Sequence, residues 1–126
     1  SFYKRLAEAP DEDAVQLLGE EMEDRFGRPP PAARRYLHLM RLKTELRRLR
    51  VLGCEASSKA VTLHLHDDTP LDPQKLIAAL AARRLPARLS PDMRLSRKPR
   101  PGEIFTSGLE HADKLLSELA PYERDR

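Results

Sequence analysis

Residues Glu21–Pro31 read EMEDRFGRPPP and predict the end of one helix and the start of the next. Gly27 is typical of the residue that stops a helix, and the prolines after it suit a new first turn. The same stretch marks a reversal of charge. Residues 8–24 contain eight carboxylates and no Lys or Arg, whereas residues 25–50 contain nine basic residues and a single acid, Glu45. Such segregation is expected of a surface that meets a charged partner.

The length of 126 residues predicts a single domain over residues 1–126. The chain begins Ser1-Phe2-Tyr3-Lys4 without an initiator Met, so we expect it to be cut from a much longer multidomain protein. No apolar run approaches the roughly 20 residues that span a bilayer, and we expect no membrane contact. One cysteine, Cys54, fits a reducing compartment, which makes the cytoplasm the expected location. A net charge of +3 does not by itself indicate nucleic-acid binding.

Helical spacing of apolar residues predicts three helices in the first part of the chain. A short helix is stopped by Pro10, and a second runs from the acids at residues 11–13 to Gly27. A third spans residues 31–51 and is closed by Gly53. In the second helix we expect an apolar stripe to face the core, formed by Val15, Leu18, Met22 and Phe26. In the third helix the corresponding apolar stripe is expected to be formed by Leu39, Leu42, Leu46 and Leu49.

Alternating apolar residues predict strands after Gly53. Residues 61–66 alternate, with residues 54–57 as a hairpin partner, and a second hairpin is expected on either side of Pro91-Asp92. Asp72 and Ser107 are expected to cap two further helices. The helix that begins at Asp72 should face the core with Leu76, Ile77 and Leu80. The helix that begins at Ser107 should face the core with Leu109, Ala112, Leu116 and Leu119. The expected fold is α/β (α+β): N-terminal helices packed on a small, mostly antiparallel sheet, with two further helices.

Motifs for catalysis are absent from the sequence. It has no phosphate-binding loop, no dinucleotide fingerprint, no zinc-protease motif and no Cys/His cluster with zinc spacing. His64 and His66 share one strand face, but two histidines without a third ligand are more typical of a solvated face. We therefore expect neither an enzyme, nor a cofactor, nor a metal site in this chain.

Two charged faces remain as candidate sites. Glu21 and Asp24 lie three residues apart on the outer face of the second helix, beside Leu17 and Glu20. This face is either a solvated acidic surface or a docking surface. The helix of residues 31–51 carries a basic face that is either solvated or in contact with nucleic acid, with Arg34, Arg35, Arg41 and Arg48 as the contact residues.

Three motifs resemble one family in order and spacing. They are SFYKR at Ser1–Arg5, the E-x-x-D-R-F-G frame at Glu21–Gly27, and D-P-x-x-L-I at Asp72–Ile77. Over essentially all 126 residues the chain resembles the C-terminal domain of the bacterial transcription-repair coupling factor, by pattern only after about residue 87.

The resemblance implies a non-catalytic domain within an ATP-dependent DNA translocase that displaces stalled RNA polymerase and recruits the damage sensor of nucleotide excision repair. Such a domain folds against the N-terminal module that carries the sensor-docking surface, hides that surface, and restrains the motor until polymerase is engaged. The family's contact acids correspond to Glu21 and Asp24, which would meet arginines of that module. The alternative is a small nucleic-acid-binding module that uses the basic helix 31–51, although direct DNA contact is not expected.

Overall fold

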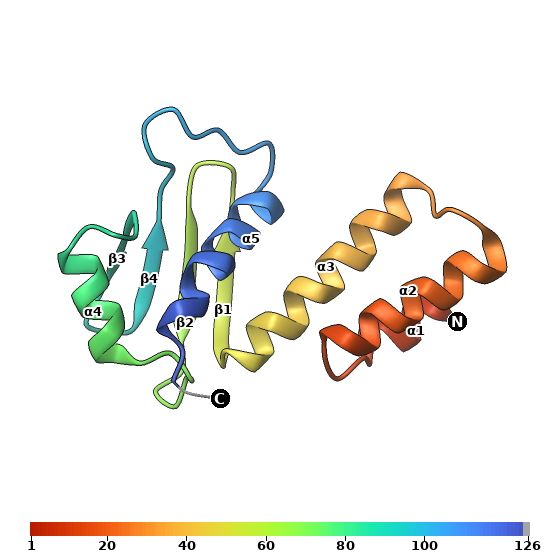
Figure 1. Ribbon diagram of the computed structural model, residues 1–126, viewed down its shortest axis with the longest axis horizontal. Helices are drawn as coiled ribbons and strands as arrows, with labels where there is room; N and C mark the ends of the chain where they lie inside the picture. The colour runs from red at the N-terminus through yellow and green to blue at the C-terminus, as the bar shows by residue number, and fades with distance from the viewer. Residues whose placement is uncertain (125–126) are drawn as a thin grey trace. The chain divides into compact units, whose positions relative to one another are not determined.

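The computed structural model describes residues 1–124, which divide into two compact units, Ser1–Arg48 and a second that begins at Leu49. The first unit contains three helices, α1 (Phe2–Ala7), α2 (Glu12–Phe26) and α3 (Pro31–Arg48) (Figure 1). Its core is a small cluster contributed by all three helices or their ends: Leu6, Ala9, Val15 and Met40. Partly buried residues complete this cluster, namely Ala14, Leu18, Met22, Tyr36 and Leu37.

Local signals set the ends of these helices as predicted. The Asp11 carboxylate accepts a hydrogen bond from the Ala14 N–H at 2.8 Å and caps α2. Gly27 has φ 79°, the left-handed conformation that ends a helix and favours glycine. Pro31 begins α3.

Three predictions about the first unit and its boundary are wrong. Phe26 is 72% exposed because α2 continues past the residues that α1 and α3 bury, so its last turn has no core to face. The third helix ends at Arg48, since the chain reverses at Arg50 with φ 58°, and Gly53 belongs to a strand. Leu39 is exposed, because α3 contributes Met40 to the core cluster.

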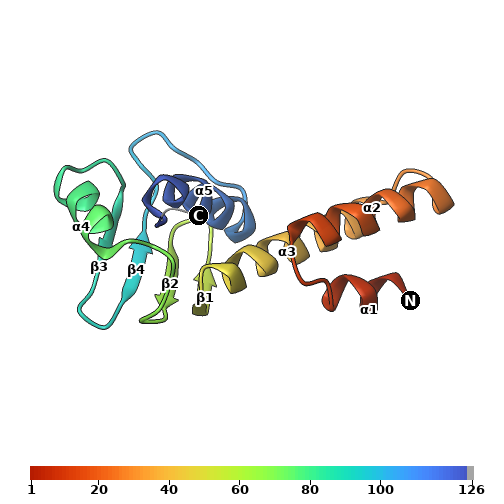
Figure 2. The ribbon, with the colours of Figure 1, turned by 60° about the horizontal axis from the view of Figure 1, so that its bottom comes forward.

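The second unit is a four-stranded antiparallel sheet with two helices on one face (Figure 2). Its strands are β1 (Val51–Ala56), β2 (Val61–Leu65), β3 (Ala87–Leu89) and β4 (Arg94–Arg97), in the order β1-β2-β4-β3. Helix α4 (Pro73–Ala81) packs beside β3, and α5 (Gly108–Leu119) packs on β1 and β2, followed by the 3₁₀ turn η1 (Ala120–Tyr122). The inward positions of the central strands are fully buried: Val61, Leu63, Leu65 and Leu95.

The mixed α/β class, both hairpins and both helix caps are confirmed. Asp72 accepts from the Gln74 N–H at 3.0 Å, and Ser107 from the Glu110 N–H at 3.1 Å. Ile77 was wrongly placed inside: it is 56% exposed, because α4 buries Leu76 and Ala79, which lie about 100° from it around the helix or further. In α5 the buried residues are His111, Ala112, Leu115 and Leu119, so the stripe runs through Leu115 instead of the predicted Leu116.

The expected single domain over residues 1–126, with N-terminal helices packed on the sheet, stays a prediction. No helix within residues 1–124 is long and apolar enough to cross a membrane.

Candidate docking surface

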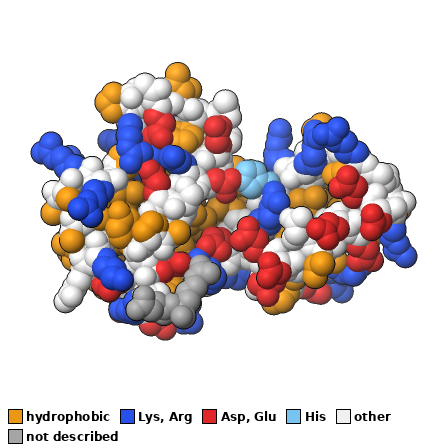
Figure 3. Space-filling model, viewed as in Figure 1, with side chains coloured by type: hydrophobic (Ala, Val, Ile, Leu, Met, Phe, Trp, Pro, Cys, Tyr) orange, Lys and Arg blue, Asp and Glu red, His pale blue; other side chains and the backbone are white. Residues whose placement is uncertain are grey.

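The outer face of α2 carries one exposed apolar side chain among carboxylates. Leu17 is 65% exposed, and helical spacing places Glu20 and Glu21 one turn further along the same face and Asp24 two turns further along it. The structure therefore brings together the four residues that the sequence predicted for docking. In Figure 3 acidic side chains gather over the α1 and α2 region, on the face turned to the viewer.

Glu21 is already held by an arginine of the same unit. The Arg5 guanidinium donates to both carboxylate oxygens of Glu21, at 2.9 and 3.3 Å, and this pair joins α1 to α2. The hydrogen bond from Arg5 holds the pKa of Glu21 below its usual range. Arg5 also lies over the Phe2 ring, 5.3 Å from its centroid, and Phe2 meets Phe26 edge to face at 5.7 Å. Sequence patterns could not predict the role of Arg5, because its partner Glu21 is 16 residues away.

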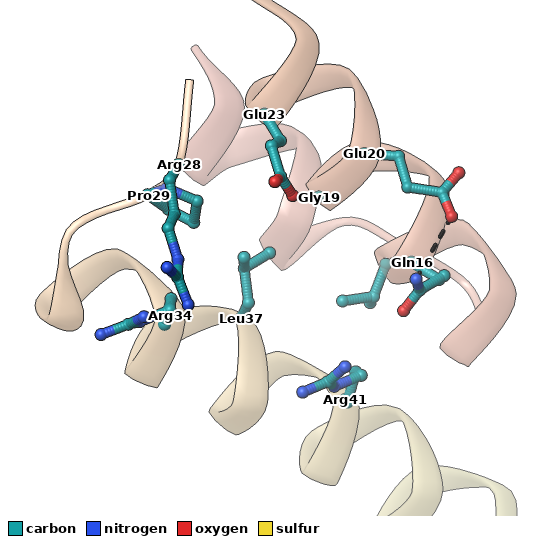
Figure 4. A pocket seen from close by; sticks show the side chains of 10 residues that line it. Gln16, Gly19, Glu20, Glu23, Arg28, Pro29, Arg34, Leu37 and Arg41 are labelled. Atoms are coloured by element: carbon teal, nitrogen blue, oxygen red, sulfur yellow. Dashed lines mark hydrogen bonds between the residues drawn. The ribbon is translucent and has the colours of Figure 1, made fainter. Parts of the chain in front are cut away.

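Asp24 and Glu20 have different surroundings. Among the residues that the structure describes, the Asp24 side chain makes no hydrogen bond or ion pair, so its carboxylate is open to an outside partner. Glu20 accepts a hydrogen bond from the Gln16 amide at 3.3 Å (Figure 4). Leu17 and Asp24 thus form an unpaired part of the acidic face, whereas Glu21 is oriented by Arg5.

A pocket of about 400 Å³ lies between α2 and α3. Figure 4 shows Glu20 and Glu23 on α2, Arg28 on the connecting loop, and Arg34 and Arg41 on α3 around it. These charges of both signs form no ion pair with one another in the described chain. The pocket is therefore mixed in charge.

Three of the four arginines proposed for nucleic-acid contact, Arg34, Arg41 and Arg48, lie along one face of α3 at seven-residue spacing, but carboxylates accompany this row. Arg34 and Arg41 line the mixed pocket, opposite carboxylates. Arg48 is bound to Glu45, with its Nε donating at 3.1 Å. Arg35 lies about 100° around α3 from Arg34. Since a phosphate backbone needs a row of unopposed cations, this arrangement does not favour the nucleic-acid alternative.

A second charged cluster, in the other unit, surrounds a buried arginine and was missed by sequence reasoning. Arg97 on β4 has no exposed surface, and its guanidinium donates to Glu118 at 2.6 Å and to Glu103 at 3.1 Å. Arg100 also donates to Glu118, at 2.7 Å. The ring of Phe105 covers Arg97, with the guanidinium carbon 5.3 Å from the ring centroid. This cluster connects β4, the loop after it and α5, so we assign it a structural role.

Ionisation of the cluster is decided by its arginines. Burial alone would raise the pKa values of Glu118 and Glu103, but hydrogen bonds and charge from Arg97 and Arg100 outweigh it and lower both. Burial would lower the pKa of Arg97, and its two carboxylate partners outweigh this and raise it. All three side chains therefore stay charged at neutral pH.

Within residues 1–124, no group of three or more His, Cys, Asp or Glu side chains is arranged to hold a metal ion. Burial raises the pKa of the Cys54 thiol, which disfavours the reactive thiolate.

A helical unit followed by a four-stranded antiparallel sheet with two helices on one face defines the class of this chain. Residues 1–76 match the TRCF domain family. The chain is 31% identical over 119 residues to the transcription-repair-coupling factor of Myxococcus xanthus, covering 94% of this chain and 10% of that protein. It is 32% identical over 80 residues to the transcription-repair-coupling factor of Escherichia coli strain K12, covering 64% and 7%.

The fold is similar to that in the crystal structure of the C-terminal domain of transcription-repair coupling factor, with a TM-score of 0.70 at 21% identity, covering 97% of this chain and 78% of that one. The chain belongs to the TRCF domain family, which confirms the predicted resemblance. It spans about a tenth or less of the length of the curated relatives that it matches.

Proposed function

We propose that this chain is a non-catalytic regulatory domain of a transcription-repair coupling factor. It docks through the outer face of α2 on the N-terminal, repair-sensor-docking module of the same protein. Docked, it hides the sensor-binding surface and restrains the DNA translocase of the parent protein, and engagement of stalled RNA polymerase releases it. The parent then acts in nucleotide excision repair in the cytoplasm.

One observation carries this proposal: an exposed leucine surrounded by carboxylates on a rigid, capped helix. An apolar side chain ringed by charged groups is the usual composition of a protein interface, with the apolar residue at its desolvated centre. Leu17 supplies that centre, and Asp24 supplies a carboxylate without an internal partner. Arginines on the partner module would match this face in charge and in hydrogen-bonding geometry.

Arg5 has a supporting part in the proposed contact. A carboxylate has about four lone-pair sites, so Glu21 can accept from a partner arginine while it remains bound to Arg5. Because the Arg5 pair fixes the rotamer of Glu21 before docking, less side-chain entropy is lost when the contact forms.

The proposal is tested in the full-length protein with Asp24→Asn, which removes a carboxylate that pairs with no other described residue. We expect basal translocation and binding of the damage sensor both to rise, because partner arginines would be left unpaired. Glu21→Ala with Asp24→Ala should raise both further. The matched control is Glu55→Ala with Asp67→Ala, which removes two exposed, unpaired carboxylates from the second unit.

Arg5→Ala separates docking from folding. If Glu21 acts only through its pair with Arg5, Arg5→Ala should reproduce the effect of Glu21→Ala. If Glu21 contacts the partner module directly, Arg5→Ala should have a smaller effect than Glu21→Ala. Unchanged translocation and sensor binding in a folded Glu21→Ala, Asp24→Ala protein would refute docking through α2. A salt-dependent shift of DNA by the isolated chain at physiological ionic strength would instead support the basic-helix alternative.

A further inference from the structure

A groove of about 590 Å³ lies in the second unit, where the C-terminal end of α4 meets β3 and β4. Its apolar lining comes from Leu80, Leu85, Pro86 and Ala87. Its charged lining comes from Arg83, Arg88 and Lys98, and no acidic side chain lines it. The groove therefore combines an aliphatic surface with charge of one sign, unlike the mixed pocket between α2 and α3.

The three cations are available to a ligand. Arg83, Arg88 and Lys98 are all exposed, and within residues 1–124 none of them has a side-chain hydrogen bond or ion pair. Two other exposed arginines of the unit do have acidic partners: Arg94 is paired with Asp92 at 3.0 Å and Arg50 with Asp68 at 3.2 Å. A cluster of unpaired cations is electrostatically unfavourable by itself and becomes favourable when an anion binds.

The backbone of Arg83 is the second observation. Its φ is 57°, the left-handed conformation, and its N–H donates to the Leu80 carbonyl at 3.1 Å while the Arg84 N–H donates to the Ala79 carbonyl at 2.9 Å. This is a Schellman ending of α4, in which Arg83 occupies the position that glycine strongly favours. An arginine there carries a conformational cost that glycine would avoid. Arg83 nevertheless occupies this position, and its side chain lines the groove.

We propose that this groove is a docking site for an acidic protein segment in which a leucine-like side chain is flanked by Asp or Glu. The aliphatic lining accepts the apolar side chain, and Arg83, Arg88 and Lys98 accept the flanking carboxylates. A nucleic acid fits less well, because single-stranded bases bind by stacking on aromatic side chains and the groove has none. Duplex DNA needs a longer track of cations than these three.

The test uses the whole 126-residue chain and a synthetic 12-residue peptide made of Glu-Glu-Leu repeats. Matched probes are the same peptide with Gln for Glu, and a 12-nucleotide oligothymidylate. Binding is followed by fluorescence anisotropy at physiological salt, and the site is located from methyl NMR shifts. We expect the acidic peptide to bind and to shift the methyl signals of Leu80 and Leu85, and the Gln peptide to bind more weakly.

The variant Arg83→Gly, Arg88→Gln, Lys98→Gln should weaken peptide binding by about tenfold or more. The control variant Lys43→Gln, Lys59→Gln, Lys75→Gln removes the same charge at exposed lysines outside the groove and should leave binding close to that of the unaltered chain. Arg83→Gly alone should keep or raise the melting temperature, since glycine suits the left-handed position, so any binding that this single variant loses cannot be ascribed to unfolding.

Three results would overturn the proposal: equal loss of binding in the lysine control, equal binding of the Gln peptide, or oligothymidylate binding that the groove variant abolishes. None of these substitutions touches α2, so failure here leaves the proposed docking of α2 standing.

Discussion

Arg97 determines which nitrogen of His111 carries the proton. The Arg97 guanidinium, which can only donate, lies 3.0 Å from His111 Nε2, so Nε2 accepts and the proton is on Nδ1. Nδ1 in turn donates to the carbonyl oxygen of Ser57 at 3.0 Å, in the turn between β1 and β2. The imidazole therefore joins α5 to the hairpin in its neutral form, and the Phe105 ring stacks on it at 4.2 Å.

Arg97→Ala should destabilise the second unit by about 3–5 kcal/mol, because it removes the fully buried guanidinium that binds Glu103 and Glu118 and leaves the buried His111 without its donor. Urea unfolding measures the free energy of unfolding. Arg94→Ala, three residues away on the same strand, is the control: its pair with Asp92 is exposed and should contribute little. Equal losses in the two variants would show that the buried network is not what stabilises β4.

Acid should weaken the same network. The folded-state pKa values of Glu118 and Glu103 are lowered, so their contribution is fully present above the ordinary glutamate value of 4.5. It is lost as the pH falls below 4.5 and through the lowered values. The free energy of unfolding should therefore decline as the pH falls below 4.5, and Glu118→Gln should reduce that decline. A pH dependence that Glu118→Gln leaves unchanged would contradict this assignment.

Gly108→Ala should destabilise the contact between α5 and the first hairpin. A Cβ at residue 108 would lie 2.4 Å from the carbonyl oxygen of Ala56, and backbone cannot yield cheaply. We expect a loss of about 1–3 kcal/mol by thermal or urea unfolding. Gly53→Ala is the control, since a Cβ there meets nothing within 4 Å, and it should leave stability unchanged or slightly higher. A Gly108→Ala protein as stable as the Gly53→Ala control would refute the close approach.

Phe26→Ala should cost only about 1 kcal/mol, because the exposed ring contributes an edge-to-face contact with Phe2 and little burial. Leu6→Ala, in the core of the same unit, should cost about 2–5 kcal/mol. The comparison is made by unfolding in urea. A loss at Phe26 as large as that at Leu6 would mean that the ring is buried in solution.

Leu17→Ala should weaken binding to the N-terminal module without lowering stability. Exposed leucines at the centre of an interface contribute through burial on binding, so we expect roughly a tenfold loss of affinity, measured by calorimetry. Ile77→Ala, an equally apolar and similarly exposed site in the second unit, is the matched control. Equal affinity of the Leu17 and Ile77 variants would place the docking centre elsewhere.

Features that depend on a few neighbouring residues were predictable from the sequence. The caps at Asp72 and Ser107, the stop at Gly27, and both hairpins were found, because each is decided within about four residues by hydrogen bonds or backbone conformation. The acidic face of α2 was found for the same reason, since helical periodicity alone places Leu17 and Asp24 on one face of the helix.

Burial and charge pairing between distant residues were decided only by the tertiary structure. Phe26 continues the apolar stripe of α2 but lies outside the core cluster of the first unit. The spacing of apolar residues predicts which face of a helix is buried, but it does not predict where along the helix the core ends. Glu21 finds Arg5 16 residues away, and Arg97 finds Glu118 21 residues away, across elements that meet only when the chain has packed. From sequence alone, a charged residue is expected to be exposed to solvent. It can be buried only where residues brought together by folding supply the ion pairs and hydrogen bonds that offset the cost of desolvation.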